Sequence, residues 1–107
     1  MLPPDHVAKI LIVDDDEGLL LLMAEALRAE GHEVATATSG RAALQSIDEH
    51  TPDLMLLDLK MREVDSPTLL AKLQQGETRP PFIVVTGQGD EKVAVEVMKR
   101  GALDYVM

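Results

Sequence analysis

Acidic residues and one hydroxyl group follow three apolar segments of this chain, at positions where they could support chemistry. The segments and the polar residues that follow them are 7–13 with Asp14 and Asp15, 54–57 with Asp58, and 82–85 with Thr86. A carboxylate at the end of a buried strand can act as a nucleophile or a metal ligand, because ligands of open α/β sheets bind at the carboxyl ends of the strands. Considered alone, Asp58 could equally cap a following helix, since Asp is a preferred N-cap residue.

If the three strands are neighbours, their polar ends meet in one shallow pocket. Three carboxylates in such a pocket would repel one another unless a cation compensates, and Mg²⁺ is the expected cation because it prefers oxygen ligands. A carboxylate nucleophile beside Mg²⁺, with a hydroxyl donor at Thr86, suits phosphoryl transfer to Asp58 as an acyl phosphate. The alternative is a solvated acidic patch, which is disfavoured because these acids follow buried strands instead of lying on helix faces.

The elements that would position these groups alternate along the chain. Apolar runs bounded by turn residues predict strands at 7–13, 33–38, 54–58, 82–86 and 104–107. Helical periodicity predicts helices at 17–30, 41–49, 67–75 and 91–100, with N-caps at Ser39, Ser66 and Asp90 and stops at Gly31, Gly76 and Gly101. This order predicts a parallel sheet with right-handed crossovers and helices on both faces.

The first predicted helix has an apolar stripe that we expect to face the sheet. It consists of the residues 19, 22, 23, 26 and 27, which leaves Leu20 and Leu21 exposed. In the second predicted helix, the inward residues are expected to be Ala43, Leu44 and Ile47.

Composition limits the classes of function. A length of 107 residues suits one domain, and a net charge of −9 disfavours direct contact with nucleic acid or an anionic membrane. The sequence has no cysteine and no apolar run long enough to span a membrane, so we expect a cytoplasmic protein. One Tyr, one Phe and no Trp leave little aromatic surface for stacking on bases.

Four runs of this sequence resemble the receiver domain of two-component response regulators. The runs are Lys9–Asp16, Asp53–Met61, Ile83–Gly87 and Gly101–Tyr105. They span nearly the whole chain in the order and spacing of that family. The resemblance implies a flavodoxin-like, CheY-like α/β fold with strand order 2-1-3-4-5, and a single receiver domain over residues 1–107.

The resemblance also implies a site and a partner. A sensor histidine kinase or a phosphotransfer protein would donate a phosphoryl group from a phosphohistidine to Asp58, with Mg²⁺ bound in the site. By position, Asp15 resembles the direct metal ligand, Asp14 resembles the ligand that acts through water, and Lys60 falls where the family lends a backbone carbonyl to the metal.

Two further positions resemble the conformational switch of the family. Thr86 matches the hydroxyl that follows the phosphoryl group, and Tyr105 matches the aromatic residue whose rotamer reports the switch. Without the family pattern, Thr86 would be read as a β-branched strand residue and Tyr105 as a half-buried strand aromatic. The implied output is a changed partner surface on the fourth helix and fifth strand, which would act on a fused or separate effector. The domain would catalyse only its own phosphotransfer and dephosphorylation.

The sequence departs from the family at two places. After Met61 the family usually has Pro-Gly and then Asp-Gly, where this chain has Arg62-Glu63 and Asp65-Ser66, so the loop beside Asp58 is bulkier and more charged. The Lys that the family carries just beyond the position of Met107, and the fifth helix after it, are not in this sequence. We therefore expect a receiver domain that is incomplete at its C-terminus.

A missing fifth helix would leave one half of a sheet face uncovered beside the first helix. We expect such a chain to continue beyond Met107 or to cover that face with a second copy, as a homodimer through the first helix or by exchange of elements.

Two other functions stay open. A phosphatase of the haloacid dehalogenase type also uses a strand-end Asp and Mg²⁺, but it needs a second Asp at the position of Lys60. An unphosphorylated receiver-like interaction module is the remaining alternative, and its usual mark, a missing acid, is not present here.

Overall fold

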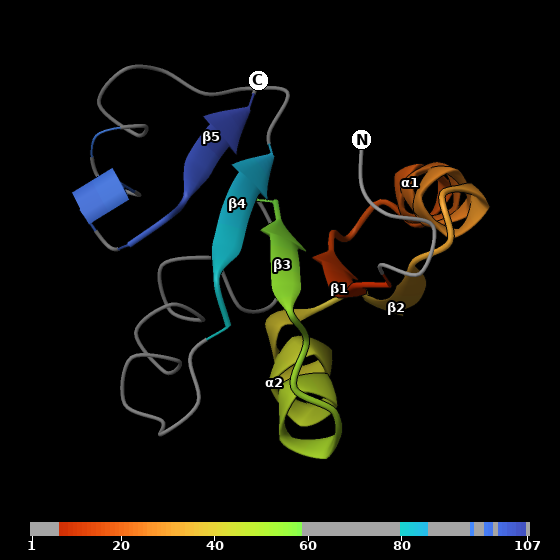
Figure 1. Ribbon diagram of the computed structural model, residues 1–107. Coiled ribbons are helices and arrows are strands. Elements are labelled where there is room, and N and C mark those ends of the chain that lie inside the picture. The colour runs from red at the N-terminus through yellow and green to blue at the C-terminus, as the bar shows by residue number, and fades with distance from the viewer. Residues whose placement is uncertain (1–6, 59–79, 86–94, 96–97, 100, 107) are drawn as a thin grey trace.

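The computed structural model describes residues 7–58, 80–85, 95, 98–99 and 101–106. The elements in these residues are β1 (Lys9–Val13), α1 (Glu17–Ala29), β2 (Glu33–Ala37), α2 (Gly40–Glu49), β3 (Leu54–Leu57), β4 (Phe82–Val85) and β5 (Asp104–Val106). All strand pairs are parallel, and the strands form one sheet in the order β2-β1-β3-β4-β5 (Figure 1). The predicted flavodoxin-like α/β architecture and strand order are thus confirmed.

The two helices cover opposite faces of the sheet (Figure 1). On one face, Ala43 and Ile47 of α2 belong to the same buried cluster as the β3 residues Met55 and Leu57. On the other face, residues of α1 pack with alternate residues of β1. That second cluster contains Ile10, Ile12, Leu20 and Ala24. Because side chains alternate along a strand, β1 contributes to the buried clusters on both faces of the sheet.

Burial is unequal on the two faces. The register aligns Val13, Leu57 and Val84 in one row across the face of α2, and none of these three side chains is exposed to solvent. The matching row on the face of α1 contains Ile12, Leu56 and Ile83, of which only Ile12 is fully buried. Coverage of the α1 face falls from β1 towards β4. The predicted self-association through this face stays a prediction.

The inward side of α1 differs from the predicted stripe. Leu20 is buried, with 4% of its surface exposed, so the prediction of an exposed Leu20 is wrong. In α1, Leu21 is exposed as predicted, but Leu19 and Leu22, which were expected on the inward stripe, are exposed as well. Met23 and Leu27 of that stripe are partly buried against the core. Leu19 to Leu22 form an unbroken apolar run, so the sequence fits an apolar stripe in either of two rotations of the helix. The small Ala24, one turn after Leu20, lets that side of α1 approach the sheet closely. The expected inward residues of α2 are confirmed, with Ala43 and Ile47 buried and Leu44 partly buried against the core.

Helix ends follow the predicted signals. Gly31 has a φ of 92°, and the N–H of His32 donates to the carbonyl of Leu27, so α1 ends in a Schellman motif that favours glycine. The Ser39 hydroxyl oxygen accepts a hydrogen bond from the N–H of Ala42 at 3.1 Å. Ser39 is therefore the N-cap of α2, as predicted.

Some predicted boundaries shift by one or two residues. β1 begins at Lys9 instead of Val7, β2 ends at Ala37 instead of Thr38, and β3 ends at Leu57, so Asp58 is the first residue beyond its strand. The predicted helix over 67–75, its N-cap Ser66 and its stop at Gly76 lie outside the described residues. Of the predicted helix over 91–100, the described positions 95, 98 and 99 are helical, and Gly101 follows them with a φ of 101°.

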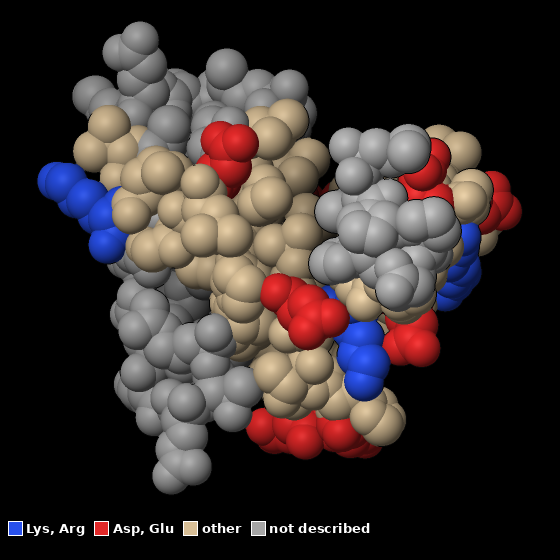
Figure 2. Space-filling view, viewed as in Figure 1, with Lys and Arg blue, Asp and Glu red and all other residues tan. Residues whose placement is uncertain are grey.

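None of the helices in the described residues combines the length and apolarity that crossing a bilayer requires. On the side of the molecule shown in Figure 2, acidic side chains are dispersed over α1, α2 and β5 and are not gathered into one patch. The acids that follow β1 and β3, by contrast, form a group, in which Asp14, Asp15 and Asp58 bring carboxylate oxygens together.

Candidate functional site

Backbone hydrogen bonds position the two strand ends that carry the acids. The N–H of Asp14 donates to the carbonyl of Ala37 at 3.1 Å, and the N–H of Asp58 donates to the carbonyl of Val13 at 2.9 Å. Each bond continues the ladder by one step beyond the last strand pair, which joins Val13 to Ala37 on one side and to Leu57 on the other. The carboxyl ends of β2, β1 and β3 are therefore held together before any side chain contributes.

The side chains of Asp14, Asp15 and Asp58 meet at this edge, as predicted. One carboxylate oxygen from each residue lies within 4.8 Å of those of the other two. Asp14 is buried, with 6% of its surface exposed, while Asp15 and Asp58 are half-buried. The cluster is thus open to solvent on the side of Asp15 and Asp58 and closed on the side of Asp14.

These three carboxylates fit a bound Mg²⁺. Like charges at this separation raise the free energy of the site, and a divalent cation would offset that cost. Mg²⁺ takes oxygen ligands, keeps several waters and is usually held by one or two carboxylates, so a half-open group of three acids suits it better than a closed cage would. The donor set contains no sulfur or nitrogen ligand, and this disfavours zinc or copper.

The third residue of the acidic run has a different role. Asp16 is the N-cap of α1, and its Oδ1 accepts the N–H of Leu19 at 3.1 Å. Its own N–H donates to Oδ1 of Asp14 at 2.9 Å, which ties the Asp14 carboxylate to the start of the helix. The sequence interpretation assigned no role to Asp16, although the spacing from Asp16 to the first helical turn is a standard N-cap signal.

The remaining predicted site residues are described only in part. Lys60 and Thr86 lie outside the described residues, so their roles stay predictions. For Tyr105 the backbone is described: it belongs to β5 and pairs with Val84 of β4.

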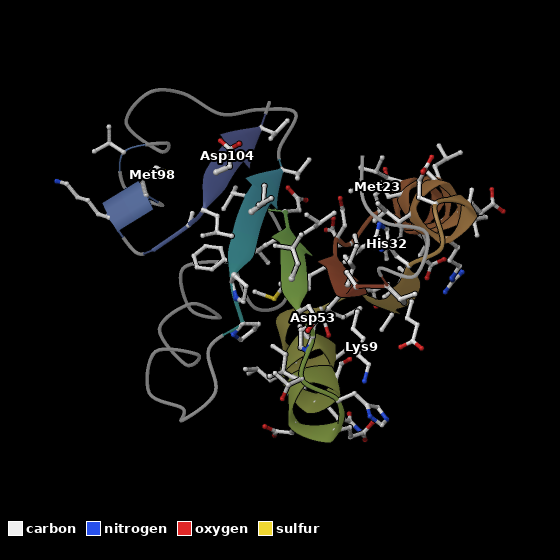
Figure 3. All side chains as sticks on the ribbon, in the orientation of Figure 1. Lys9, Met23, His32, Asp53, Met98 and Asp104 are labelled. Carbon is white, nitrogen blue, oxygen red and sulfur yellow. The ribbon has the colours of Figure 1, made fainter. Side chains whose placement is uncertain are left out.

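The opposite end of the sheet carries a different set of polar contacts. Oδ2 of Asp53 accepts the backbone N–H of Lys9 at 2.9 Å, and Figure 3 shows these two residues side by side. Nδ1 of His32 accepts the N–H of Ala8 at 3.2 Å. Because Asp53 and Asp58 flank the same short strand at opposite ends, Asp53 offers a matched control for changes at Asp58.

Comparison with known proteins shows which family this chain matches. Residues 10–107 match the family described as the response regulator receiver domain. The chain belongs to this family. The predicted resemblance is confirmed over nearly the whole sequence.

Curated and solved relatives of this receiver domain agree with the match. The regulatory protein AtoC of Escherichia coli strain K12 is 36% identical over 101 residues, which cover 94% of this chain and 22% of AtoC. The crystal structure of NtrX from Brucella abortus superposes with a TM-score of 0.86 at 33% identity, covering 94% of this chain and 24% of that one. The signal receiver domain of a Luxo repressor protein from Vibrio parahaemolyticus gives a TM-score of 0.87 at 27% identity, with 94% and 78% of the two chains covered.

The receiver domain described here spans about a fifth of the length of the curated relatives that it matches. It shares with its family a group of acidic residues suited to Mg²⁺.

Proposed function

We propose that this receiver domain is a phosphorylation-dependent switch that accepts a phosphoryl group on Asp58. The observation that carries the proposal is the meeting of the Asp14, Asp15 and Asp58 carboxylates within 4.8 Å at the carboxyl ends of β1 and β3. The donor would be a phosphohistidine of a sensor histidine kinase or of a phosphotransfer protein in the cytoplasm. Membership of the receiver family supports this class of partner.

The proposed transfer uses Asp58 as the nucleophile. A carboxylate oxygen of Asp58 attacks the phosphorus atom, the P–N bond to the donor histidine breaks, and the imidazole leaves with that electron pair and takes up a proton. Asp14 and Asp15 would hold Mg²⁺, with Lys60 offering its backbone carbonyl. When bound, Mg²⁺ supplies positive charge that offsets the charge of the phosphoryl oxygens. In dephosphorylation, water attacks the same phosphorus and the Asp58 carboxylate leaves, so the domain acts only on itself.

The proposed output runs through β4 and β5. The register pairs the backbone of Tyr105 with that of Val84. Val84 precedes Thr86 by two residues in the sequence. A hydroxyl at Thr86 that bonds the phosphoryl group would therefore act close to the strand that carries Tyr105. A contact made only in the phosphorylated state shifts a two-state equilibrium, which would alter the partner surface of the fourth helix and β5.

The relatives support an effector partner. AtoC and ZraR are named as regulatory proteins, and this chain covers 22% of each. We infer that the switch acts on an effector, which is either fused to this domain or a separate protein.

Incubation with acetyl phosphate and Mg²⁺, followed by intact mass measurement, tests the proposal. The parent chain and Asp53→Asn should both gain one labile phosphoryl group, and Asp58→Asn should gain none. Asp53→Asn makes the same chemical change at the other end of β3. No adduct on the parent chain would refute the proposal and favour an unphosphorylated interaction module. Equal labelling of Asp58→Asn would refute the assignment of the acceptor to Asp58, because another residue would then carry the phosphoryl group.

A further inference from the structure

Among the strands that the structure describes, β2 stands at one end of the sheet order, and its hydrogen-bonded neighbour there is β1. The N–H of Glu33 donates to the carbonyl of Ala8, and the carbonyl of Ala37 accepts the N–H of Asp14. The odd-numbered residues of β2 therefore direct their backbone groups towards β1. Because successive residues of a strand direct these groups to opposite sides, Val34 and Thr36 direct theirs to the free edge.

The side chain of Arg28 donates a hydrogen bond to this free edge. From the last turn of α1, its Nη2 donates to the carbonyl oxygen of Val34 at 3.0 Å. Residues 34–37 of this strand are Val, Ala, Thr and Ala, with no charge and no proline, and the one charged residue of β2, Glu33, stands at its start and directs its backbone groups to β1. A guanidinium group on an edge carbonyl is a direct obstacle to a strand that would pair there.

We propose that the free edge of β2 is a self-pairing surface for a second copy of this chain, and that the Arg28 side chain keeps it closed. The outward groups of Val34 and Thr36 lie symmetrically about Ala35. Two β2 strands could pair in antiparallel fashion about a two-fold axis at Ala35. Val34 of each copy would then lie opposite Thr36 of the other copy. The edge is thus complementary to itself.

The same geometry shows what Arg28 prevents. Each Val34–Thr36 pair would exchange two backbone hydrogen bonds, and one of the two uses the Val34 carbonyl. Arg28 already donates to that carbonyl. Full pairing therefore requires two guanidinium groups, one from each copy, to leave the edge.

The flanks of β2 leave room for a second strand. Ala35 is exposed, and its methyl group projects little from the sheet. A cavity of about 380 Å³ lies between α2 and the strands β1 and β2, and its lining includes Leu11, Ala35 and Ser46.

Sedimentation and light scattering over a concentration series, with the unphosphorylated chain, test the proposal. Arg28→Ala should self-associate more tightly than the parent chain, by about tenfold or more in the dimer dissociation constant. Arg41→Ala is the matched control, since it removes the same charge from an exposed position in α2 and leaves the Arg28 to Val34 bond in place.

A second variant identifies the surface. Thr36→Pro removes the outward N–H without removing a bond to β1, so Arg28→Ala/Thr36→Pro should return to the association of the parent chain. Association through the apolar face of α1 would not respond to Thr36→Pro. Equal association of Arg28→Ala and Arg41→Ala would overturn the proposal, as would association of Arg28→Ala that Thr36→Pro does not reverse. If thermal melting shows that Arg28→Ala does not fold, Arg28→Gln replaces it under the same criteria.

Discussion

The backbone N–H of Asp58 donates to the carbonyl oxygen of Val13 at 2.9 Å, which binds the end of β3 to the residue that directly precedes Asp14. The proposed acceptor and the first acid of the metal group are therefore neighbours because of main-chain hydrogen bonds. Substitution of either side chain leaves these bonds in place. Substitution of Asp14 also removes the hydrogen bond that its Oδ1 accepts from the N–H of Asp16, so the Tm of that variant is measured alongside its metal binding.

Removal of Asp15 should weaken Mg²⁺ binding more than removal of Asp14. A direct ligand contributes more than one that acts through water, and loss of an indirect partner typically costs about 10-fold to 100-fold in metal affinity. Titration of Mg²⁺ into Asp14→Ala and Asp15→Ala measures both effects. Asp16→Asn, which retains the helix cap, should bind Mg²⁺ as the parent does. Undiminished affinity in both alanine variants would contradict the site assignment.

Asp58→Asn should raise the thermal stability of the chain when Mg²⁺ is absent. The substitution removes one of three carboxylates whose oxygens lie within 4.8 Å of one another, and this relieves like-charge repulsion. We expect an increase of a few degrees in Tm, since about 1 kcal/mol corresponds to roughly 4–8 °C in a domain of this size. Saturating Mg²⁺ should narrow the difference, because the cation stabilises the parent more than the variant.

Calorimetry of the parent chain, Asp58→Asn and Asp53→Asn, with and without Mg²⁺, checks this expectation. Asp53→Asn should show no Mg²⁺-dependent change relative to the parent, since Asp53 lies at the other end of β3. A lower Tm for Asp58→Asn in the absence of metal would show that repulsion is not the dominant interaction in the group.

Leu20→Ala should destabilise the fold far more than Leu21→Ala. Leu20 is 4% exposed and packs with Ile10 and Ile12, while Leu21 is 58% exposed. A buried Leu→Ala change costs about 2–5 kcal/mol, and an exposed one stays within about 0.5 kcal/mol. Urea unfolding of the two variants gives the comparison. Similar losses in both would show that α1 does not pack in the phase described here.

This pair of leucines also shows where sequence patterns stop being informative. The parallel sheet followed from the alternation of apolar runs with helical periodicity, and its strand order came from the resemblance to the receiver family. The phase of α1 did not follow, since four consecutive leucines satisfy two helical stripes equally well. Only packing against Ile10 and Ile12, with Ala24 allowing close approach, selects the stripe that contains Leu20.

The site was predictable to a similar extent. The meeting of Asp14, Asp15 and Asp58 was expected from the strand ends, and their oxygens do meet. Three consecutive aspartates, however, are chemically identical in sequence, and the direction of the backbone decides that Asp16 caps α1. The contact between Arg28 and β2 was not predictable, because a long exposed side chain has many conformations and a sequence pattern selects none of them.

Thr86→Ala should leave phosphorylation of Asp58 largely intact and uncouple it from the partner surface. A hydroxyl that bonds only the phosphorylated state is a differential contact, and only differential contacts move a two-state equilibrium. One such hydrogen bond contributes about 1.5 kcal/mol, which is roughly a tenfold change in the ratio of the two states. The measurement is the set of amide NMR shifts of residues 91–105, with and without a beryllofluoride adduct at Asp58.

In the parent chain, formation of the adduct should shift the amides of residues 91–105. In Thr86→Ala those shifts should shrink, while Asp58 still takes up the phosphoryl group from acetyl phosphate. Thr38→Ala, an exposed threonine that follows β2, provides the matched control and should behave as the parent does. Because mass labelling and amide shifts are measured separately, loss of labelling in Thr86→Ala would indicate a role in the transfer itself. Full labelling with unchanged shifts would show that another residue couples Asp58 to β5.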